Sequence, residues 1–307
     1  MLLDVLCAVL AVGLDRWLGE PRRWHPLVGF GRVAAGLERR WNRGSRARRR
    51  VVGLIAVALL VLGPALAVLL LMQQLLLPIA LLLHVVLLAF ALGARSLHDH
   101  LRPIAQALAR GDLPAARDLT SRIVSRDTAQ AAPADLAKAA VESALENGND
   151  AVFGALWWFA LFGGPGALAF RLANTLDAMW GYRSERFEAY GWAAARLDDA
   201  LNWVPARLTA LSYALLGRTR EAWRCWRRQA PQWPSPNAGP VMASGAGALG
   251  LALGGAAVYD GQVEQRAPLG EGRPAEAGDI RRALRLVDGT LVLWLLVWGG
   301  LAVGLSS

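Results

Sequence analysis

The fold is decided by two neighbouring apolar stretches, VVGLIAVALLVLGPALAVLLLM (residues 51–72) and LLLPIALLLHVVLLAFALGA (residues 75–94). The first has 22 residues and no charge, and the second has 20 residues with His84 as its only titratable side chain. A helix of about 20 apolar residues crosses the roughly 30 Å hydrocarbon core of a bilayer. The pair therefore predicts two membrane-spanning helices joined by a hairpin at Gln73 and Gln74.

Two further segments have the same character. Residues 286–305 carry one charge, Asp288, and residues 1–18 are apolar but contain Asp4 and Asp15. The absence of a basic region ahead of the N-terminal segment favours a retained span over a cleaved signal peptide. With 55% apolar residues among 307, the chain is expected to be an all-α, polytopic integral membrane protein with about four to six membrane segments, some broken or re-entrant, plus cytoplasmic amphipathic helices.

The basic residues indicate how the chain is oriented. The net charge is +9, and residues 39–50 alone contain seven arginines next to an apolar span. This placement follows the positive-inside rule and removes the need for a nucleic-acid partner. We expect a multi-pass protein of the cytoplasmic (inner) membrane with its active site facing the cytoplasm. Cys7 and Cys225 stand far apart and predict neither a metal site nor a disulfide framework.

The remaining sequence divides into three parts. Residues 95–150 are predicted to form a cytoplasmic helical insert, with helices over 96–110, from the Asp112 cap to about 124, and over 135–147. Residues 151–258 contain broken and short apolar helices, including a short apolar segment at 204–216 and a small-residue helix at 241–258. Residues 259–285 read as a polar loop.

Residues 163–166, Gly-Gly-Pro-Gly, interrupt the apolar segment that begins at residue 151. Such residues do not continue a regular helix. Two readings remain open: a re-entrant pair of half-helices, or one kinked span.

Oxygen-bearing side chains gather on one predicted helix face. Glu142 and Glu146 lie four residues apart, and Asn149 or Asp150 continues their face. Carboxylates and amides are the oxygen ligands of hard cations such as Mg²⁺. The face also runs into an apolar segment, where carboxylates are costly. A solvated helix face is the alternative.

Two other faces mix arginine with carboxylates. Arg171, Asn174 and Asp177 have i, i+3, i+6 spacing, and so do Arg196, Asp199 and Asn202. Asp198 and Arg183 stand beside these groups. Arginine matches phosphate oxygens, and carboxylates hold metals, so a phosphate–Mg²⁺ site and a structural ion-pair network are equally open. Similarly, Ser235 or Asn237 either caps the next helix or leaves its N–H groups for an anion.

The chain resembles the CobD/CbiB family, the adenosylcobinamide-phosphate synthases of cobalamin biosynthesis. The resemblance covers nearly the whole chain and rests on the order and spacing of the following blocks: Leu14-Asp15…Gly19-Glu20-Pro21, Trp24-His25-Pro26, Ser121–Thr128, Glu142-Ser143…Glu146-Asn147…Asp150, Pro165-Gly166-Ala167…Arg171…Asn174-Thr175-Leu176-Asp177…Gly181-Tyr182-Arg183, Ala195–Asp199…Asn202…Pro205–Ala210 and Ser235–Gly239. One departure stands in the last block, where Trp233-Pro234 replaces the His-Pro that is usual in the family.

The resemblance implies a reaction. The family joins adenosylcobyric acid to aminopropanol phosphate or aminopropanol in an ATP-dependent amide formation that gives adenosylcobinamide phosphate. It implies ATP and Mg²⁺ as cofactors and no tightly bound prosthetic group. It also implies membrane lipid and other membrane-associated enzymes of corrinoid assembly as partners. A transporter or a scaffold without ligase activity is the alternative function.

The resemblance also implies site residues. We expect catalytic roles for Asp177, Asp198, Asp199 and Glu142, and Mg²⁺ ligation by Glu146, Asp150 and Asp177. Substrate or phosphate contacts are expected from Arg126, Asp127, Arg171, Asn174, Tyr182, Arg183, Arg196, Asn202, Ser235 and Asn237. A phosphate-binding loop containing lysine is not found in this sequence.

Overall fold

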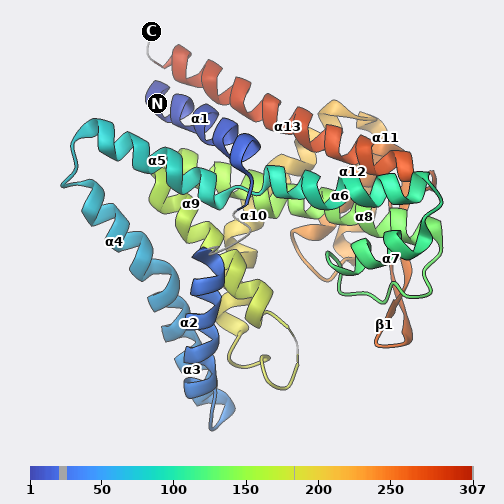
Figure 1. The fold of residues 1–307 in the computed structure, drawn as a ribbon, viewed down its shortest axis with the longest axis horizontal. Helices are drawn as coiled ribbons and strands as arrows, with labels where there is room; N and C mark the ends of the chain where they lie inside the picture. Colours follow the sequence, from blue (N-terminus) through green and yellow to red (C-terminus); the bar gives the residue numbers. More distant parts are fainter. Residues whose placement is uncertain (21–25, 183, 306–307) are drawn as a thin grey trace. The chain divides into compact units, whose positions relative to one another are not determined.

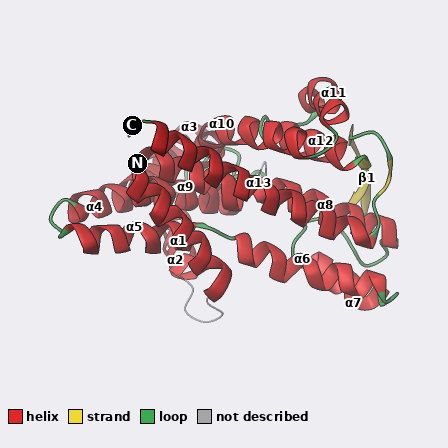
Figure 2. Ribbon diagram, turned by 90° about the horizontal axis from the view of Figure 1, so that it is seen from above, coloured by secondary structure: helices red, strands yellow, loops and turns green. Residues whose placement is uncertain are grey.

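A computed structural model describes residues 1–20, 26–182 and 184–305. The chain forms two compact units (Figure 1). The first unit comprises Met1–Gly93, Asp150–Asn202 and Gly299–Ser307, and the second comprises Ala94–Asn149 and Trp203–Trp298. Helices make up most of both units (Figure 2), which confirms the all-α class.

The first unit contains the N-terminal helices and the apolar hairpin. The residues predicted as one span at 51–72 form a single helical rod in which a π-helical turn joins two α-helices. Helix α5 packs against α1 and α9. The elements are α1 (Leu2–Leu18), α2 (Pro26–Trp41), α3 (Arg46–Val57), η1 (Ala58–Leu62), α4 (Gly63–Met72), α5 (Leu77–Ala91), η2 (Asn149–Phe153, from Asp150 onward), α9 (Gly154–Trp180) and the first part of α10 (Trp192–Leu216).

The break predicted in the apolar segment that begins at residue 151 is confirmed at Gly163. This residue has φ +63° and ψ −152° inside α9, a conformation that favours glycine. His84 of α5 fills the space beside it, and its Nδ1 accepts a hydrogen bond from the Gly164 N–H at 2.8 Å. The backbone group released by the break is therefore satisfied inside the protein, as membrane depth requires.

An aromatic core holds the other end of α9. Trp180 and Tyr190 are fully buried and meet edge to face, with ring centroids 5.0 Å apart. They pack with buried residues of α2, α3 and α10. Gly53 of α3 allows this approach, because a Cβ there would lie 2.1 Å from the carbonyl oxygen of Tyr190.

The second unit surrounds α8 with shorter elements. Asp112 caps α7 as expected, accepting a hydrogen bond from the Ala115 N–H at 3.1 Å, although this helix ends at Ser121 rather than near residue 124. The elements are α6 (Ala94–Ala109), α7 (Leu113–Ser121), α8 (Pro133–Gly148), the second part of α10, α11 (Thr219–Gln229), η3 (Ala230–Gln232), α12 (Ala238–Leu249), β1 (Leu251–Tyr259), β2 (Gln262–Leu269), β3 (Arg273–Pro274) and α13 (Ala277–Gly304), whose residues from Gly299 onward belong to the first unit.

The second unit corrects two expectations. The helix predicted over 241–258 ends at Leu249, because Gly250 adopts the left-handed conformation that terminates helices. The predicted polar loop at 259–285 is instead a strand, a short third strand and the start of α13. Strands β1 and β2 pair antiparallel through a turn in which Asp260 and Gly261 have φ of 49° and 74°. Positive φ at both turn positions is the geometry of a type I′ hairpin.

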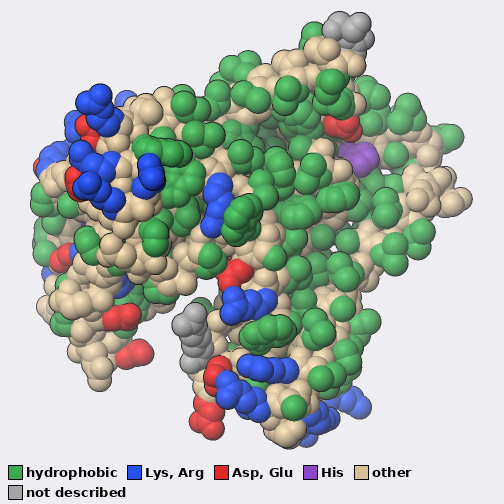
Figure 3. All heavy atoms as spheres, turned by 180° about the vertical axis from the view of Figure 1, so that it is seen from behind, with side chains coloured by type: hydrophobic (Ala, Val, Ile, Leu, Met, Phe, Trp, Pro, Cys, Tyr) green, Lys and Arg blue, Asp and Glu red, His purple; other side chains and the backbone are tan. Residues whose placement is uncertain are grey.

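Four helical segments are long and apolar enough to cross a membrane: Arg46–Met72, Leu77–Ala109, Pro133–Trp180 and Ala277–Gly304. They leave large apolar side chains uncovered, and Leu59 is 56% exposed and Leu82 62% exposed. Figure 3 shows a face largely covered by hydrophobic side chains, with lysine and arginine in a few clusters. Lipid, rather than water, suits such a surface, and the chain is a polytopic membrane protein. Helix α1, with 17 residues, is not among the four segments.

Candidate active site

Glu142 forms the centre of a buried charge cluster in the second unit. It projects from α8 and its side chain is only 3% exposed. Oε1 accepts hydrogen bonds from the Gly254 N–H at 2.7 Å and from Arg266 Nη2 at 3.2 Å. Oε2 accepts from Arg266 Nη1 at 3.0 Å and from Arg126 Nη2. Because a buried carboxylate is stable only when paired and hydrogen-bonded, Glu142 holds two guanidinium groups in fixed positions.

Arg266 reaches this cluster from β2. Its Nε donates to the Gly255 carbonyl at 3.2 Å, and its guanidinium lies over the Trp233 ring, 5.6 Å from the centroid. Burial disfavours its charge, but Glu142 and Tyr259 favour it, and the pKa of Arg266 is raised. Arg266 therefore stays cationic beside the cavity that Trp233 borders.

Arg126 comes from the segment between α7 and α8. Its side chain is 12% exposed. Nη1 is buried and has no hydrogen-bond partner within the described parts of the chain. A guanidinium with one arm held by a carboxylate and the other arm unused is suited to an anionic oxygen.

A cavity of about 280 Å³ lies beside this cluster. Half-buried Glu146 of α8, one turn after Glu142, faces the same cavity. The cavity thus combines two arginines, an additional carboxylate and an aromatic wall. Its remaining lining includes Ser125, Ser143, Asn147, Trp233, Met242 and Tyr259.

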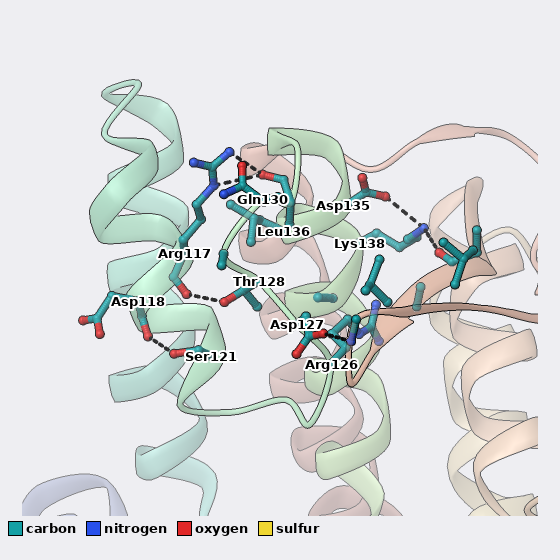
Figure 4. Close-up of a pocket in the computed structure, with 18 residues that line it drawn as sticks. Arg117, Asp118, Ser121, Arg126, Asp127, Thr128, Gln130, Asp135, Leu136 and Lys138 are labelled. Carbon is teal, nitrogen blue, oxygen red and sulfur yellow. Dashed lines mark hydrogen bonds and ion pairs between the residues drawn. The ribbon is translucent and has the colours of Figure 1, made fainter.

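A larger cavity of about 880 Å³ is also lined by Arg126. Arg126 and Ala139 line both spaces. Figure 4 shows Lys138, the only lysine of the chain, at its edge, where Nζ donates to the Ala256 carbonyl at 3.1 Å and pairs with Asp135 at 3.1 Å. Both volumes are of the order of small-molecule sites, and Arg126 connects them.

Asp127 joins the hairpin to this segment. Its N–H donates to the Val258 carbonyl at 2.8 Å, and its Oδ2 accepts from the Gly261 N–H at 2.7 Å. Asp127, predicted to bind substrate or phosphate, therefore stabilises the turn of the β1–β2 hairpin through these two hydrogen bonds.

A second polar group lies in the first unit, between α9 and α10. Asn174 Nδ2 donates to Asp198 Oδ1 at 3.2 Å, and Asn202 Nδ2 donates to Asp198 Oδ2 at 3.1 Å. Burial raises the pKa of Asp198 and the neighbouring Asp199 raises it further, against the opposing effect of the two amides. Asp177, half-buried on α9, belongs to the same unit. The structure thus brings together two of the predicted faces, those of 171–177 and 196–202.

The two arginines on these faces have different surroundings. Arg171 is 14% exposed and lies 3.6 Å from Glu20 Oε1, while its buried Nε has no hydrogen-bond partner among the described residues. Arg196 is 68% exposed and lies 4.0 Å from Asp199 Oδ2. The Arg171 side chain is therefore held inside the protein. The ion pair of Arg196 with Asp199 lies at the surface and contributes little to stability.

The predicted Mg²⁺ ligands do not form a set within either unit. Glu146 belongs to the second unit, whereas Asp150 and Asp177 belong to the first. Across the described residues, no group of three or more His, Cys, Asp or Glu side chains is arranged to hold a metal ion. Mg²⁺ that arrives with a nucleotide needs only one or two protein carboxylates besides the phosphates, and Glu146 meets that smaller requirement.

The remaining predicted residues are dispersed. Ser235 Oγ caps α12 by accepting from the Ala238 N–H at 3.1 Å. Asn237 Oδ1 accepts instead from Arg207 Nη1 at 2.8 Å. Tyr182 is 60% exposed, and Arg183 lies outside the described residues.

Sequence reasoning missed Arg266, Tyr259 and the structural position of Trp233. All three come from, or pack against, the hairpin that was read as a loop. The Asp-Gly pair at 260–261, preceded by Ala256-Ala257-Val258-Tyr259, is a hairpin signal that identifies the turn. This signal does not predict that Arg266 pairs with Glu142.

The comparisons agree on one family. The model of the CobD/Cbib protein family matches residues 8–287. A cobalamin biosynthesis protein CobD from Stutzerimonas stutzeri is 56% identical over 292 residues, covering 95% of this chain and 96% of the relative. Proteins of the same name from Chromobacterium violaceum and Mycobacterium tuberculosis are 54% and 43% identical and cover 93% and 89% of this chain, with 92% and 88% of their own length matched. No solved structure matches the chain.

Proposed function

The chain belongs to the CobD/CbiB family, which supports a role in cobalamin biosynthesis, and from this premise we propose that it is a membrane-bound amide synthase. It joins adenosylcobyric acid to aminopropanol phosphate, or to aminopropanol, at the expense of ATP. The observation that carries the proposal is the pair of arginines held by Glu142 beside a cavity that also contains Glu146.

The reaction has two steps. A propionate oxygen of the corrinoid attacks the γ-phosphorus of ATP, and the bond from that phosphorus to ADP breaks. The amine nitrogen then attacks the activated acyl carbon, inorganic phosphate leaves, and a carboxylate takes the proton from nitrogen. Both steps build negative charge on phosphoryl oxygens, which fixed cationic groups stabilise.

Arg126 and Arg266 supply that fixed charge. The Glu142 carboxylate orients both groups before substrate binds, so little reorganisation is needed during the reaction. Arg126 Nη1 donates to a phosphoryl oxygen, and Arg266 is supported from below by Trp233. Glu142 itself, with both oxygens in use, acts as a positioning residue for the two arginines.

Glu146 is the candidate for the remaining acid–base or metal role. When bound with the nucleotide, Mg²⁺ neutralises phosphate charge, and Glu146 is the carboxylate in this cavity that would hold it. Asp177, Asp198 and Asp199 keep their predicted catalytic roles as a separate hypothesis about the first unit. The seven arginines of residues 39–50 support a reaction that faces the cytoplasm, where ATP is supplied.

A reconstituted reaction tests the proposal. Purified protein in detergent receives adenosylcobyric acid, aminopropanol phosphate, ATP and Mg²⁺, and product mass and ADP are followed together. We expect stoichiometric product and ADP from the wild type. We expect Arg266→Gln to lower kcat/KM by about a hundredfold or more, since removing one charge-stabilising donor costs that much in other enzymes. Arg220→Gln, an exposed arginine of α11, is the matched control.

A transporter remains the second candidate because helix α9 is broken at Gly163, and broken helices are typical of transporters. If neither product nor ADP forms, the amide synthase proposal is wrong. Uptake of adenosylcobyric acid into protein-containing vesicles then separates a transporter from a scaffold, which takes up nothing.

A further inference from the structure

Another cavity in the second unit lies away from the Glu142 cluster. It has a volume of about 440 Å³ and lies between α6 and α13. Three arginines border it, Arg102 from α6 and Arg281 and Arg285 from successive turns of α13. All three are exposed, and none forms an ion pair within the described residues. Arg285 Nε donates to the Arg281 backbone carbonyl at 3.4 Å. The cavity is therefore cationic and its arginines are available.

Two residues that line this cavity, His98 and Asp288, contact each other. His98 is 3% exposed, and its Nε2 lies 3.0 Å from Asp288 Oδ1. Its Nδ1 is also buried and has no hydrogen-bond partner in the part of the chain that is described. Gln106 adds an amide at the edge. With one carboxylate against three guanidiniums, the cavity keeps a net positive charge of about two when His98 is neutral, which favours an anion.

The position of the cavity along α13 identifies the kind of anion. Val292, Leu296 and Val297 of the same helix are 53–69% exposed, as expected for side chains that contact lipid. Val292 follows Arg285 by seven residues, which is about 10 Å along a helix. The head-group layer occupies about 5–7 Å on each side of the hydrocarbon, and arginine side chains reach along a helix toward it.

We propose that this cavity binds the phosphate of an anionic phospholipid head group. Arg102, Arg281 and Arg285 donate to the phosphate oxygens, and the acyl chains lie along the exposed apolar side chains of α13. Basic pockets between membrane-crossing helices bind acidic head groups in this way. A soluble phosphate ester shares the anion but has no acyl chains to occupy the apolar part of the helix.

Native mass spectrometry of the full chain in detergent tests the proposal. The protein is mixed with equal amounts of phosphatidylglycerol and phosphatidylcholine that carry the same acyl chains. We expect the wild type to retain phosphatidylglycerol with about a tenfold preference or more, because several arginines contribute to one head-group contact. The triple variant Arg102→Gln, Arg281→Gln, Arg285→Gln is expected to lose the preference.

A second triple variant controls for charge alone. Arg110→Gln, Arg220→Gln and Arg228→Gln remove three exposed arginines from outside the cavity, and we expect the lipid preference to remain. Unchanged melting temperatures of both triple variants in lipid-free detergent show that folding is intact. Should the first triple variant melt early, the single change Arg281→Glu replaces it and is expected to lower retention at least as strongly as one neutralised arginine.

Two results would overturn the proposal. One is equal loss of phosphatidylglycerol in both triple variants, which indicates a diffuse charge effect. The other is binding of glycerol 3-phosphate as tightly as phosphatidylglycerol with the same dependence on the three arginines, which identifies a soluble phosphate ester as the ligand. Neither result bears on amide synthesis, whose cavities lie elsewhere in the unit.

Discussion

Glu142 shows how one side chain organises several others. Its two oxygens receive Arg126, Arg266 and the Gly254 N–H, so β1, β2 and the segment before α8 all converge on one carboxylate. Burying two arginines costs solvation energy, which their shared partner and hydrogen bonds offset.

The first prediction concerns this carboxylate. Glu142→Gln keeps the shape but leaves two nearly buried guanidiniums without their counter-ion, and we expect a loss of about 3 kcal/mol or more in stability. The melting temperature in detergent should fall by several degrees. Glu264→Gln, an exposed change on β2, should alter stability by less than about 0.5 kcal/mol. Equal melting temperatures for both variants would contradict the central position of Glu142.

The second prediction concerns pH and two carboxylates of the first unit. Hydrogen bonds from Arg186 lower the pKa of Glu38 below its ordinary 4.5. Glu38 therefore stabilises the fold above its unfolded pKa, and this contribution is lost as pH falls. Burial raises the pKa of Asp198 above its ordinary 3.8. Its protonated form is favoured in the fold, so its contribution is fully present below the unfolded pKa and is lost as pH rises.

Melting temperatures measured against pH separate the two effects. As pH is lowered from 7, the wild type should lose stability relative to Glu38→Gln and gain stability relative to Asp198→Asn. Each variant serves as the control for the other. If the difference in melting temperature between the wild type and each variant changed with pH in the same direction for both variants, one of the two pKa directions would be wrong.

At the scale of elements, the break in α9 depends on a single glycine. A Cβ at Gly163 would lie 2.3 Å from the His84 ring, and φ is positive. We expect Gly163→Ala to cost about 1–3 kcal/mol from the backbone conformation alone, with the steric conflict in addition. Yield of monodisperse protein and melting temperature measure the loss. Gly36→Ala in α2, where nothing lies within 4 Å, should be neutral or stabilising.

His84 separates the two causes within this element. The double variant Gly163→Ala, His84→Ala removes the conflict with the ring and keeps the backbone strain, but it also removes the acceptor of the Gly164 N–H. His84→Ala alone measures that loss and is subtracted. We expect it to recover part of the melting temperature lost by Gly163→Ala. Full recovery would show that the positive φ carries no cost.

The β1–β2 hairpin is the element that delivers Arg266. Asp127 holds its turn through the Gly261 N–H and the Val258 carbonyl. We expect Asp127→Ala to increase hydrogen exchange of hairpin amides and to lower kcat/KM, because Arg266 is then less well positioned. Asp99→Ala, an exposed change on α6, is the control. An unchanged exchange pattern in Asp127→Ala would remove Asp127 from this role.

At the scale of the whole molecule, the apolar hairpin predicts a topology. Ser45 lies within the arginine-rich residues 39–50, and Gln74 lies in the connection between α4 and α5. Ser45→Cys should react with a membrane-impermeant maleimide only from the cytoplasmic side, and Gln74→Cys only from the opposite side. The native Cys7 and Cys225 are both buried and give a low background. Labelling of both positions from one side would contradict the two crossings.

The sequence predicted most of the architecture for identifiable reasons. Uncharged runs of 20 or more residues leave few alternatives to membrane helices, and Gly-Gly-Pro-Gly located the break at Gly163. Helical spacing also predicted which side chains share a face within 171–177 and within 196–202, whereas the contact between the two faces is tertiary. The helix predicted over 241–258 was wrong only beyond Leu249, where Gly250 ends the helix and strand β1 begins, because small residues suit both a packed helix and a strand.

What the sequence by itself determined is local: apolar length, helical spacing, caps and the glycine break, each governed by neighbours in the chain. Only the tertiary structure decided that Glu142 meets Arg266 across 124 positions and that His84 accepts the hydrogen bond released by the break in α9. These pairings join residues distant in sequence. They depend on how buried charges find partners when elements pack, and no local pattern encodes that choice.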